Sequence, residues 1–245
     1  MTSTLDPLET LRGAANGLDV ADALRLAILD GTLQPGTRLV QPQIAQAFGI
    51  SRTPVREALH KLHGWGLVDL IVNHAAVVRR VRREQYANAF VVWAELAALA
   101  VGLATKQGSR VTEQLRAAVR EEWTIVDAVT AQGAEQSAVA GRWTAVQTAF
   151  HAAVLAGSGS TRVRATIATT TELLRWETMW KAVEDRPYPL RSFALRHEEI
   201  MVLMQRNEPP QAAACMREHI IEMGDTFLAW LDRTSDASED SSNGE

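Results

Sequence analysis

Three histidines carry the clearest chemistry in this sequence. His151, His197 and His219 each lie within an apolar segment of helical periodicity. A single histidine in such a place is usually a hydrogen-bonded core residue. Three on separate helices of one bundle can instead converge, and neutral imidazoles bind transition metals well. The pattern therefore predicts either a metal site, with zinc or nickel as the ion, or three buried hydrogen-bonding groups.

The same histidines could support hydrolysis, because three imidazoles, a metal ion and a water molecule are enough for that chemistry. However, no carboxylate stands beside them at the spacing of a known metallohydrolase motif, and His-x-x-x-His pairs are absent. Glu198 and Glu199 directly follow His197, but adjacent helical residues point in different directions. The pattern favours a protein that is not an enzyme, with a metal-dependent hydrolase as the alternative.

The histidines need a scaffold, and the chain from Glu84 to Arg233 shows helical patterns and no convincing strand. Glycine and proline turn signals divide it into six segments. The predicted helices are residues 84–107, 111–132, 135–157, 160–183, 189–206 and 208–232. The sequence thus predicts an all-α bundle of six to seven helices over 84–232 and a disordered acidic tail over 233–245.

A second pattern, over residues 41–65, predicts a helix, a tight turn and another helix. Gly49 can adopt the left-handed conformation that ends the first helix, and Ser51 can cap the second. The second helix has an inward stripe of Val55, Leu59 and Leu62 and an opposite face of Arg52, Thr53, Arg56 and His60. An apolar back and arginines near the N-terminal end are typical of recognition in the DNA major groove.

Two short strands are predicted directly after that helix, over 67–72 and 75–81, with the turn Asn73-His74 between them. With a helix predicted over 18–30, the order becomes helix, helix, recognition helix and two-stranded wing. The mainly α fold thus starts with a winged helix-turn-helix domain over 18–83, after a flexible arm over 1–17. The residues expected to contact DNA are Arg38, Arg52, Thr53, Arg56, Asn73 and His74.

Charge differs between the two predicted domains. The 245-residue chain has a net charge of −4, but residues 18–83 carry nine Lys or Arg against five Asp or Glu, a charge of +4 that leaves −8 for the rest. A basic module joined to an acidic one suits a DNA-binding regulator. Cys215 is the only cysteine, so a reducing cytoplasm is expected. The sequence predicts neither a membrane-spanning helix nor a signal segment.

The stretches ILDGTLQPGTRL, IAQAFGISRTPVREALHKL and GLVDL resemble the GntR family of bacterial transcription regulators. The resemblance covers the predicted winged domain and implies that Arg52, Thr53 and Arg56 contact DNA. Two positions depart from the family pattern. Gln41-Pro42 replaces a charged pair before the turn, and Asn73 replaces a glycine at the wing tip.

The helical region resembles the effector domain of the FCD branch of these regulators. There an Asp-x-x-Phe-His run supplies two metal ligands, and two further histidines complete the site. Here the run begins with Gln147 and ends with His151, and the segments RHEEI and REHI supply His197 and His219. The resemblance implies these histidines as ligands, with Gln147 as a neutral fourth ligand one turn before His151. Replacing Gln147 by aspartate is expected to tighten metal binding.

The resemblance also implies a small-molecule effector, which is expected to be an organic acid. The family often pairs the glutamate found here as Glu95 with an arginine one turn earlier, where this chain has Val91. The charge of a carboxylate would then be met by the metal or by another cation. Arg164 and Arg175 are candidates, with surface salt bridges as the alternative.

These patterns together predict a ligand-responsive, sequence-specific transcription regulator that is expected to act as a repressor. It would bind a pseudo-palindromic operator in double-stranded DNA as a homodimer, without a membrane partner. The alternatives are the metal-dependent hydrolase and an architectural DNA-binding protein that has no effector.

Overall fold

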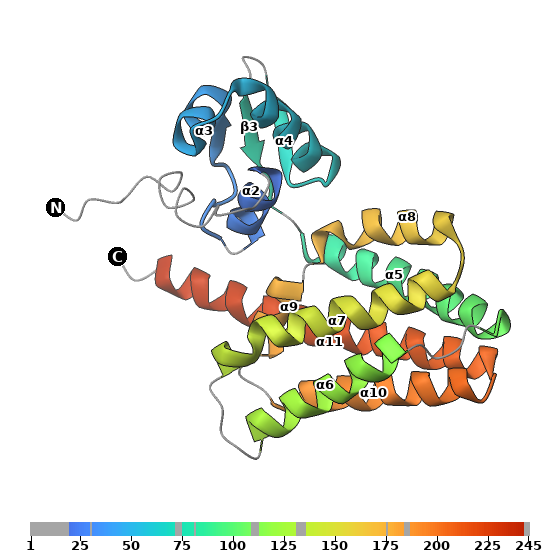
Figure 1. Cartoon of the computed structure of the whole chain (residues 1–245). Coiled ribbons are helices and arrows are strands. Elements are labelled where there is room, and N and C mark those ends of the chain that lie inside the picture. The colour runs from blue at the N-terminus through green and yellow to red at the C-terminus, as the bar shows by residue number, and fades with distance from the viewer. Residues whose placement is uncertain are drawn as a thin grey trace. The chain divides into compact units, whose positions relative to one another are not determined.

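The computed structural model describes residues 20–29, 31–71, 75–80, 82–108, 113–130, 136–174, 176–183 and 187–242. The chain divides into two compact units, residues 1–82 and residues 83–245 (Figure 1). Three parts of the sequence prediction lie outside the described residues: the arm over 1–17, the wing tip at Asn73-His74, and Arg175.

The first unit is a winged helix-turn-helix, as the sequence predicts. Its elements are α2 (Val20–Leu29), β1 (Arg38–Val40), α3 (Gln41–Phe48), α4 (Arg52–Gly64), β2 (Val68–Ile71) and β3 (Ala75–Val78). The sheet is antiparallel, in the order β1-β3-β2. The sequence does not predict β1, because a strand of three residues is too short to show an alternating pattern. Its buried Leu39 pairs with Ala76 and closes the core of the unit.

The turn between α3 and α4 depends on Gly49, which has a φ of 67°. Its N–H donates to the carbonyl of Gln46, and the N–H of Ile50 donates to the carbonyl of Ala45. Glycine adopts this left-handed conformation at little energetic cost, so the predicted end of α3 is confirmed. Ser51 occupies the N-cap position of α4, but its side chain makes no capping hydrogen bond.

The second unit is an all-α bundle, which confirms the predicted fold class. Its elements are α5 (Arg83–Lys106), α6 (Glu113–Thr130), α7 (Gln136–Gly157), α8 (Thr161–Thr170), the 3-10 turn η1 (Thr171–Leu173), α9 (Trp176–Val183), α10 (Pro187–Gln205) and α11 (Pro209–Ser242). Helix α5 packs along α11, α6 contacts both α7 and α10, and α8 packs on α5 (Figure 1).

The structure corrects two predicted boundaries. The sequence predicts one helix over 160–183, but the structure has α8, η1 and α9 there. The hydroxyls of Thr166, Thr170 and Thr171 bond to carbonyls four residues earlier, and β-branched residues are weak helix formers, so the helix ends within this threonine run. The sequence also predicts a disordered tail from residue 233, whereas α11 continues to Ser242, because extending an existing helix costs little.

By length and composition alone, α5 is the one helix in the described part of the chain that could cross a membrane. This apolar helix differs from the sequence prediction, in which no membrane-spanning helix occurs. Half of its most apolar 18-residue stretch is buried inside the unit, and Phe90, Trp93 and Val101 are among the buried side chains. Since α5 packs against α7, α8 and α11, it is a core helix of the bundle.

Helices α5 and α11 approach each other closely at Gly224. A Cβ atom there would lie 2.8 Å from Cγ of Phe90, whose ring packs against Trp93 and Phe227. We expect the overlap in Gly224→Ala to lower the free energy of unfolding by about 1–3 kcal/mol. Alanine favours a helix over glycine by roughly 1 kcal/mol, and this gain offsets part of the loss. Denaturant unfolding measures the change.

Gly141→Ala is the matched control, because a Cβ atom at this position of α7 has open space around it. This variant should keep its stability or gain up to about 1 kcal/mol. Two variants of equal stability would contradict the close approach at Gly224.

Candidate functional site

The bundle brings the three predicted histidines into one cluster. His151 comes from α7, His197 from α10 and His219 from α11, and one ring nitrogen of each lies within 4.8 Å of the others. The Nε2 atoms of His197 and His219 are 3.0 Å apart. Both of these side chains are completely buried, and His151 is 8% exposed. The cluster has the proximity and the burial that a metal site requires.

Two of these histidines are held in the neutral form. Burial is the largest cause that places the pKa values of His151 and His219 well below the ordinary histidine value. A neutral imidazole keeps the lone pair that a metal ion needs. Near neutral pH, both side chains are therefore in the form that binds metal.

A carboxylate that the sequence does not predict as part of the site lies against this cluster. Glu122 of α6 is completely buried, and its Oε2 lies 2.6 Å from Nδ1 of His197. Its Oε1 accepts a hydrogen bond of 2.6 Å from Nε2 of Gln147, which is also completely buried. Because a carboxylate only accepts, Nδ1 of His197 carries the proton in this contact.

One sequence signal could have identified Glu122. It falls on the inward stripe of α6, together with Leu115, Val119 and Val126. A charged residue at such a position is rarely buried without a partner. Glu122 is not close to any of the three histidines along the chain, because it lies on a different helix.

Several buried atoms of the histidine cluster and of Gln147 lack a hydrogen-bond partner within the described chain. They are Nε2 of His151, Nδ1 of His219 and Oε1 of Gln147. Buried polar atoms are normally paired, so an unpaired group of them indicates a ligand. Imidazole nitrogens and an amide oxygen suit a divalent transition ion such as zinc or nickel. The three histidines and Gln147 therefore fit a metal ion.

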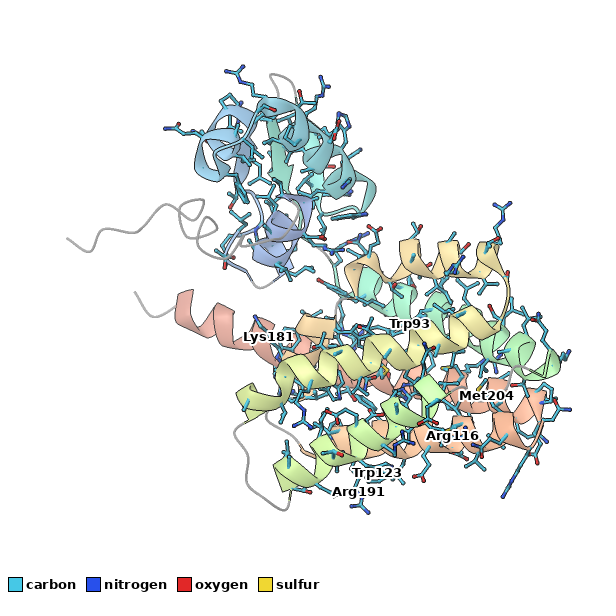
Figure 2. All side chains as sticks on the ribbon, viewed as in Figure 1. Trp93, Arg116, Trp123, Lys181, Arg191 and Met204 are labelled. Carbon is cyan, nitrogen blue, oxygen red and sulfur yellow. The ribbon has the colours of Figure 1, made fainter. Side chains whose placement is uncertain are left out.

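A cavity of about 220 Å³ lies beside His151 and is lined by residues of α5, α7, α8, η1, α9 and α11. Trp93 and Trp176 form part of its wall, with ring centroids 5.5 and 5.2 Å from that of His151. Figure 2 shows Trp93 among the side chains between the helices of the bundle. Most of the remaining lining is aliphatic and includes Ala97 and Leu155. The cavity therefore suits a small, largely apolar molecule.

Few polar side chains face this cavity. Arg164 of α8 lines it, and its guanidinium forms no ion pair with a residue in the described ranges. The other polar lining residues are Thr148, His151 and Thr171. Arg164 is thus the one lining residue, among those described, that carries a fixed positive charge.

Glu95 lies outside this cavity. Its carboxylate accepts hydrogen bonds of 2.6 and 2.9 Å from Arg217 of α11, and these bonds lower the pKa of Glu95. The pair borders a separate surface groove together with Leu99 and Lys106. Arg217 thus pairs with Glu95 in this chain, where Val91 occupies the position of the family's arginine. The position of Glu95 does not support the effector-binding role that the resemblance implies.

In the first unit, α4 presents the predicted recognition face. Arg52, Thr53 and Arg56 are exposed together, whereas Val55 on the other side of the helix is completely buried. Arg38, at the start of β1, is exposed as well. This part of the molecule offers phosphate and base edges a face of fixed positive charge.

A winged helix-turn-helix with an exposed arginine face, joined in one chain to a helical bundle with a cavity, defines a two-domain transcription regulator. The chain belongs to the GntR family, in the branch that carries an FCD domain. The family model for bacterial regulatory proteins of the gntR family matches residues 16–78, and the model of the FCD domain matches residues 88–222. The resemblance seen in the sequence is confirmed.

Bacterial operon repressors are among the similar proteins. A probable D-xylose utilization operon transcriptional repressor of Paenarthrobacter nicotinovorans is 25% identical over 202 residues, which are 82% of this chain and 84% of the relative. The gluconate operon transcriptional repressor of Bacillus subtilis (strain 168) is 39% identical over 74 residues, which are 30% of each chain. The second match is therefore limited to part of each protein.

Two solved structures share the overall fold. E. coli McbR/YncC has a TM-score of 0.57 at 19% identity, and the match covers 94% of this chain and 100% of that one. Lar, which controls the expression of the Listeria monocytogenes agr system, has a TM-score of 0.60 at 17% identity, covering 86% and 95%. At these identities, the likeness establishes the fold alone.

Proposed function

We propose that this protein is a homodimeric cytoplasmic repressor that binds a small carboxylic acid in its bundle and releases its operator in response. The observation that carries the proposal is the cavity of about 220 Å³ between the histidine cluster and Arg164. The operon repressors among the similar proteins support the regulatory role.

One arginine and a candidate metal site at this cavity suit a carboxylate head group. The guanidinium of Arg164 can bond both oxygens of a carboxylate. A divalent zinc or nickel ion, held by His151, His197, His219 and Gln147, would supply a second, Lewis-acidic centre. Because all four of these donors are neutral, the positive charge of the ion would favour an anionic ligand.

The remainder of the ligand is expected to be apolar and about the size of one ring. An apolar cavity of about 150 Å³ can hold benzene, so a cavity of about 220 Å³ has room for a ring and a carboxylate. Trp93 and Trp176 offer aromatic faces to such a ring. Thr148 and Thr171 provide the only lining hydroxyls among the described residues, too few for a sugar acid. We therefore propose an aromatic or compact aliphatic monocarboxylate.

The response to this ligand would involve α5 and α8, which share the wall of the cavity. Helix α5 begins at Arg83, where the second unit starts. A ligand that binds better to one arrangement of these helices shifts the population toward it. In a dimer on a pseudo-palindromic operator, such a shift would change how the two winged helix-turn-helix domains fit the half-sites.

The two alternative functions have less support from the described residues. Both oxygens of the buried Glu122 accept hydrogen bonds, so it is not free to activate water for a metal-dependent hydrolase. An architectural DNA-binding protein without an effector would need no cavity, and the cavity beside His151 argues against that function.

Benzoate and phenylacetate are expected to bind the full-length, metal-loaded protein more tightly than D-gluconate does. Arg164→Ala should weaken the binding of the preferred acid about tenfold or more, because a hydrogen bond to a charged group contributes roughly 1.5–3 kcal/mol. Isothermal titration calorimetry measures both effects. The same acid should release the protein from DNA fragments that it selects from the genome of its source bacterium.

Arg162→Ala is the matched control, because Arg162 is exposed on the same helix and does not line the cavity. It should bind the acid as the parent does. Tighter binding of D-gluconate, or equal weakening in both arginine variants, would contradict the proposed ligand and its contact with Arg164.

A further inference from the structure

Glu122 is a charged residue in an apolar position. Its neighbours on the inward side of α6 include Leu115, Val119 and Ile125, and none of its own surface is exposed. Burial of a carboxylate in such surroundings is costly unless its oxygens are hydrogen-bonded. Both oxygens are bonded here: one partner is His197 of the histidine cluster, and the other is Gln147, one helical turn before His151.

The bond to Gln147 determines which end of its amide is free. A glutamine amide has a donor end and an acceptor end, and rotation by half a turn exchanges them. The Nε2 of Gln147 donates to Glu122 over 2.6 Å, so its Oε1 points away from that carboxylate and has no partner in the described chain. Only the oxygen can ligate a metal ion, so this bond keeps the ligating end free.

The bond to His197 selects the tautomer of its ring. Since Nδ1 donates to Glu122, the lone pair of the neutral ring lies on Nε2. That atom faces Nε2 of His219 at 3.0 Å. Metal-ligating histidines commonly donate their other N–H to a carboxylate in this way, which fixes the ring and makes it a stronger ligand.

We infer that Glu122 is a positioning residue of the metal centre, which orients Gln147 and His197 as ligands without binding the ion itself. The inference rests on the proposed metal site and concerns a residue outside its ligand set. Glu122 also supplies the negative charge that a neutral glutamine at position 147 does not. The ligands of the centre therefore lie on α7, α10 and α11, whereas its negative charge lies on α6.

Glu122→Gln tests this inference in the full-length protein. Gln147 and His197 donate to different oxygens of Glu122, and a glutamine has an oxygen at only one of these two sites, so it cannot keep both hydrogen bonds. We expect zinc and nickel affinities, measured by competition with a chromogenic chelator, to fall about 10- to 100-fold. Glu121→Gln is the matched control, because it removes the same charge from the same helix at an exposed residue that pairs with Arg142. It should bind both ions within about twofold of the parent.

The exchange variant Glu122→Gln/Gln147→Glu separates positioning from a structural role. It keeps one carboxylate and one amide in contact, and the amide oxygen at position 122 still accepts from His197. We expect metal affinity at least equal to that of the parent. If Glu122→Gln does not fold, this double variant alone decides: parent-like affinity supports the inference, and weak binding overturns it. If the single variant does fold, weak metal binding by the double variant still overturns the inference.

The remaining outcomes distinguish the inference from the proposed function. A parent that binds neither ion in metal analysis and titration overturns both. A parent that binds metal, with Glu122→Gln equally tight, overturns only the positioning role of Glu122. Thermal unfolding of each protein without metal, measured in parallel, shows whether a loss of affinity reflects a loss of folded protein.

Discussion

His197→Ala is expected to abolish tight metal binding and to destabilise the metal-free protein by roughly 3–5 kcal/mol, the usual effect of leaving a buried charge without its partner. The substitution removes a ligand and also the donor to Oε2 of Glu122. It further removes a ring that stacks on Phe150 at a centroid distance of 3.7 Å. Metal analysis and denaturant unfolding of the metal-free protein measure the two effects separately.

His219→Ala provides the comparison. It removes another fully buried ligand but no hydrogen bond to Glu122. We expect a similar loss of metal affinity with a smaller loss of stability. If both variants lost the same stability, Glu122 would not depend on His197 for its burial. If neither lost metal, the histidine cluster would not be the metal site.

The second large effect concerns the DNA-binding face. Arg52→Ala and Arg56→Ala are each expected to weaken operator binding by about 1–3 kcal/mol, because an arginine that contacts a base in two places contributes that much discrimination. Both side chains are exposed on α4, so thermal unfolding should not change. Fluorescence anisotropy with the selected DNA fragment, repeated over a range of salt concentrations, measures the loss.

Arg116→Ala removes the same charge from the exposed surface of the bundle (Figure 2) and serves as the control. It should leave operator affinity unchanged. An Arg52 or Arg56 variant that binds operator like this control, at every salt concentration, would remove that residue from the recognition face.

The DNA-binding head was predictable because its signals are local. Gly49 ends α3, and the stripe of Val55, Leu59 and Leu62 fixes which side of α4 is buried, so the exposed side could be named from the sequence. Strand β1 was not predictable in this way. It exists through its pairing with β3, whose residue Ala76 lies far along the chain from Leu39.

The sequence by itself determined that three histidines face the interior of a helical bundle, because each lies on the apolar stripe of its own helix. The position of Arg164 at the cavity and that of Glu95 outside it depended on how α5, α8 and α11 pack. The effect of Gln147→Asp on metal binding, which the sequence predicts to be tighter, likewise depends on how the helices pack. That substitution would place a second carboxylate against Glu122, which lies on another helix.

Only the tertiary structure brought Glu122 to Gln147 and His197, which lie 25 and 75 positions further along the chain. The physical reason is the range of the forces involved. Periodicity reports whether a side chain is buried, since burial depends on the face of its own helix. Which buried polar groups become partners depends on how the helices pack against one another, and no local pattern in the sequence records that.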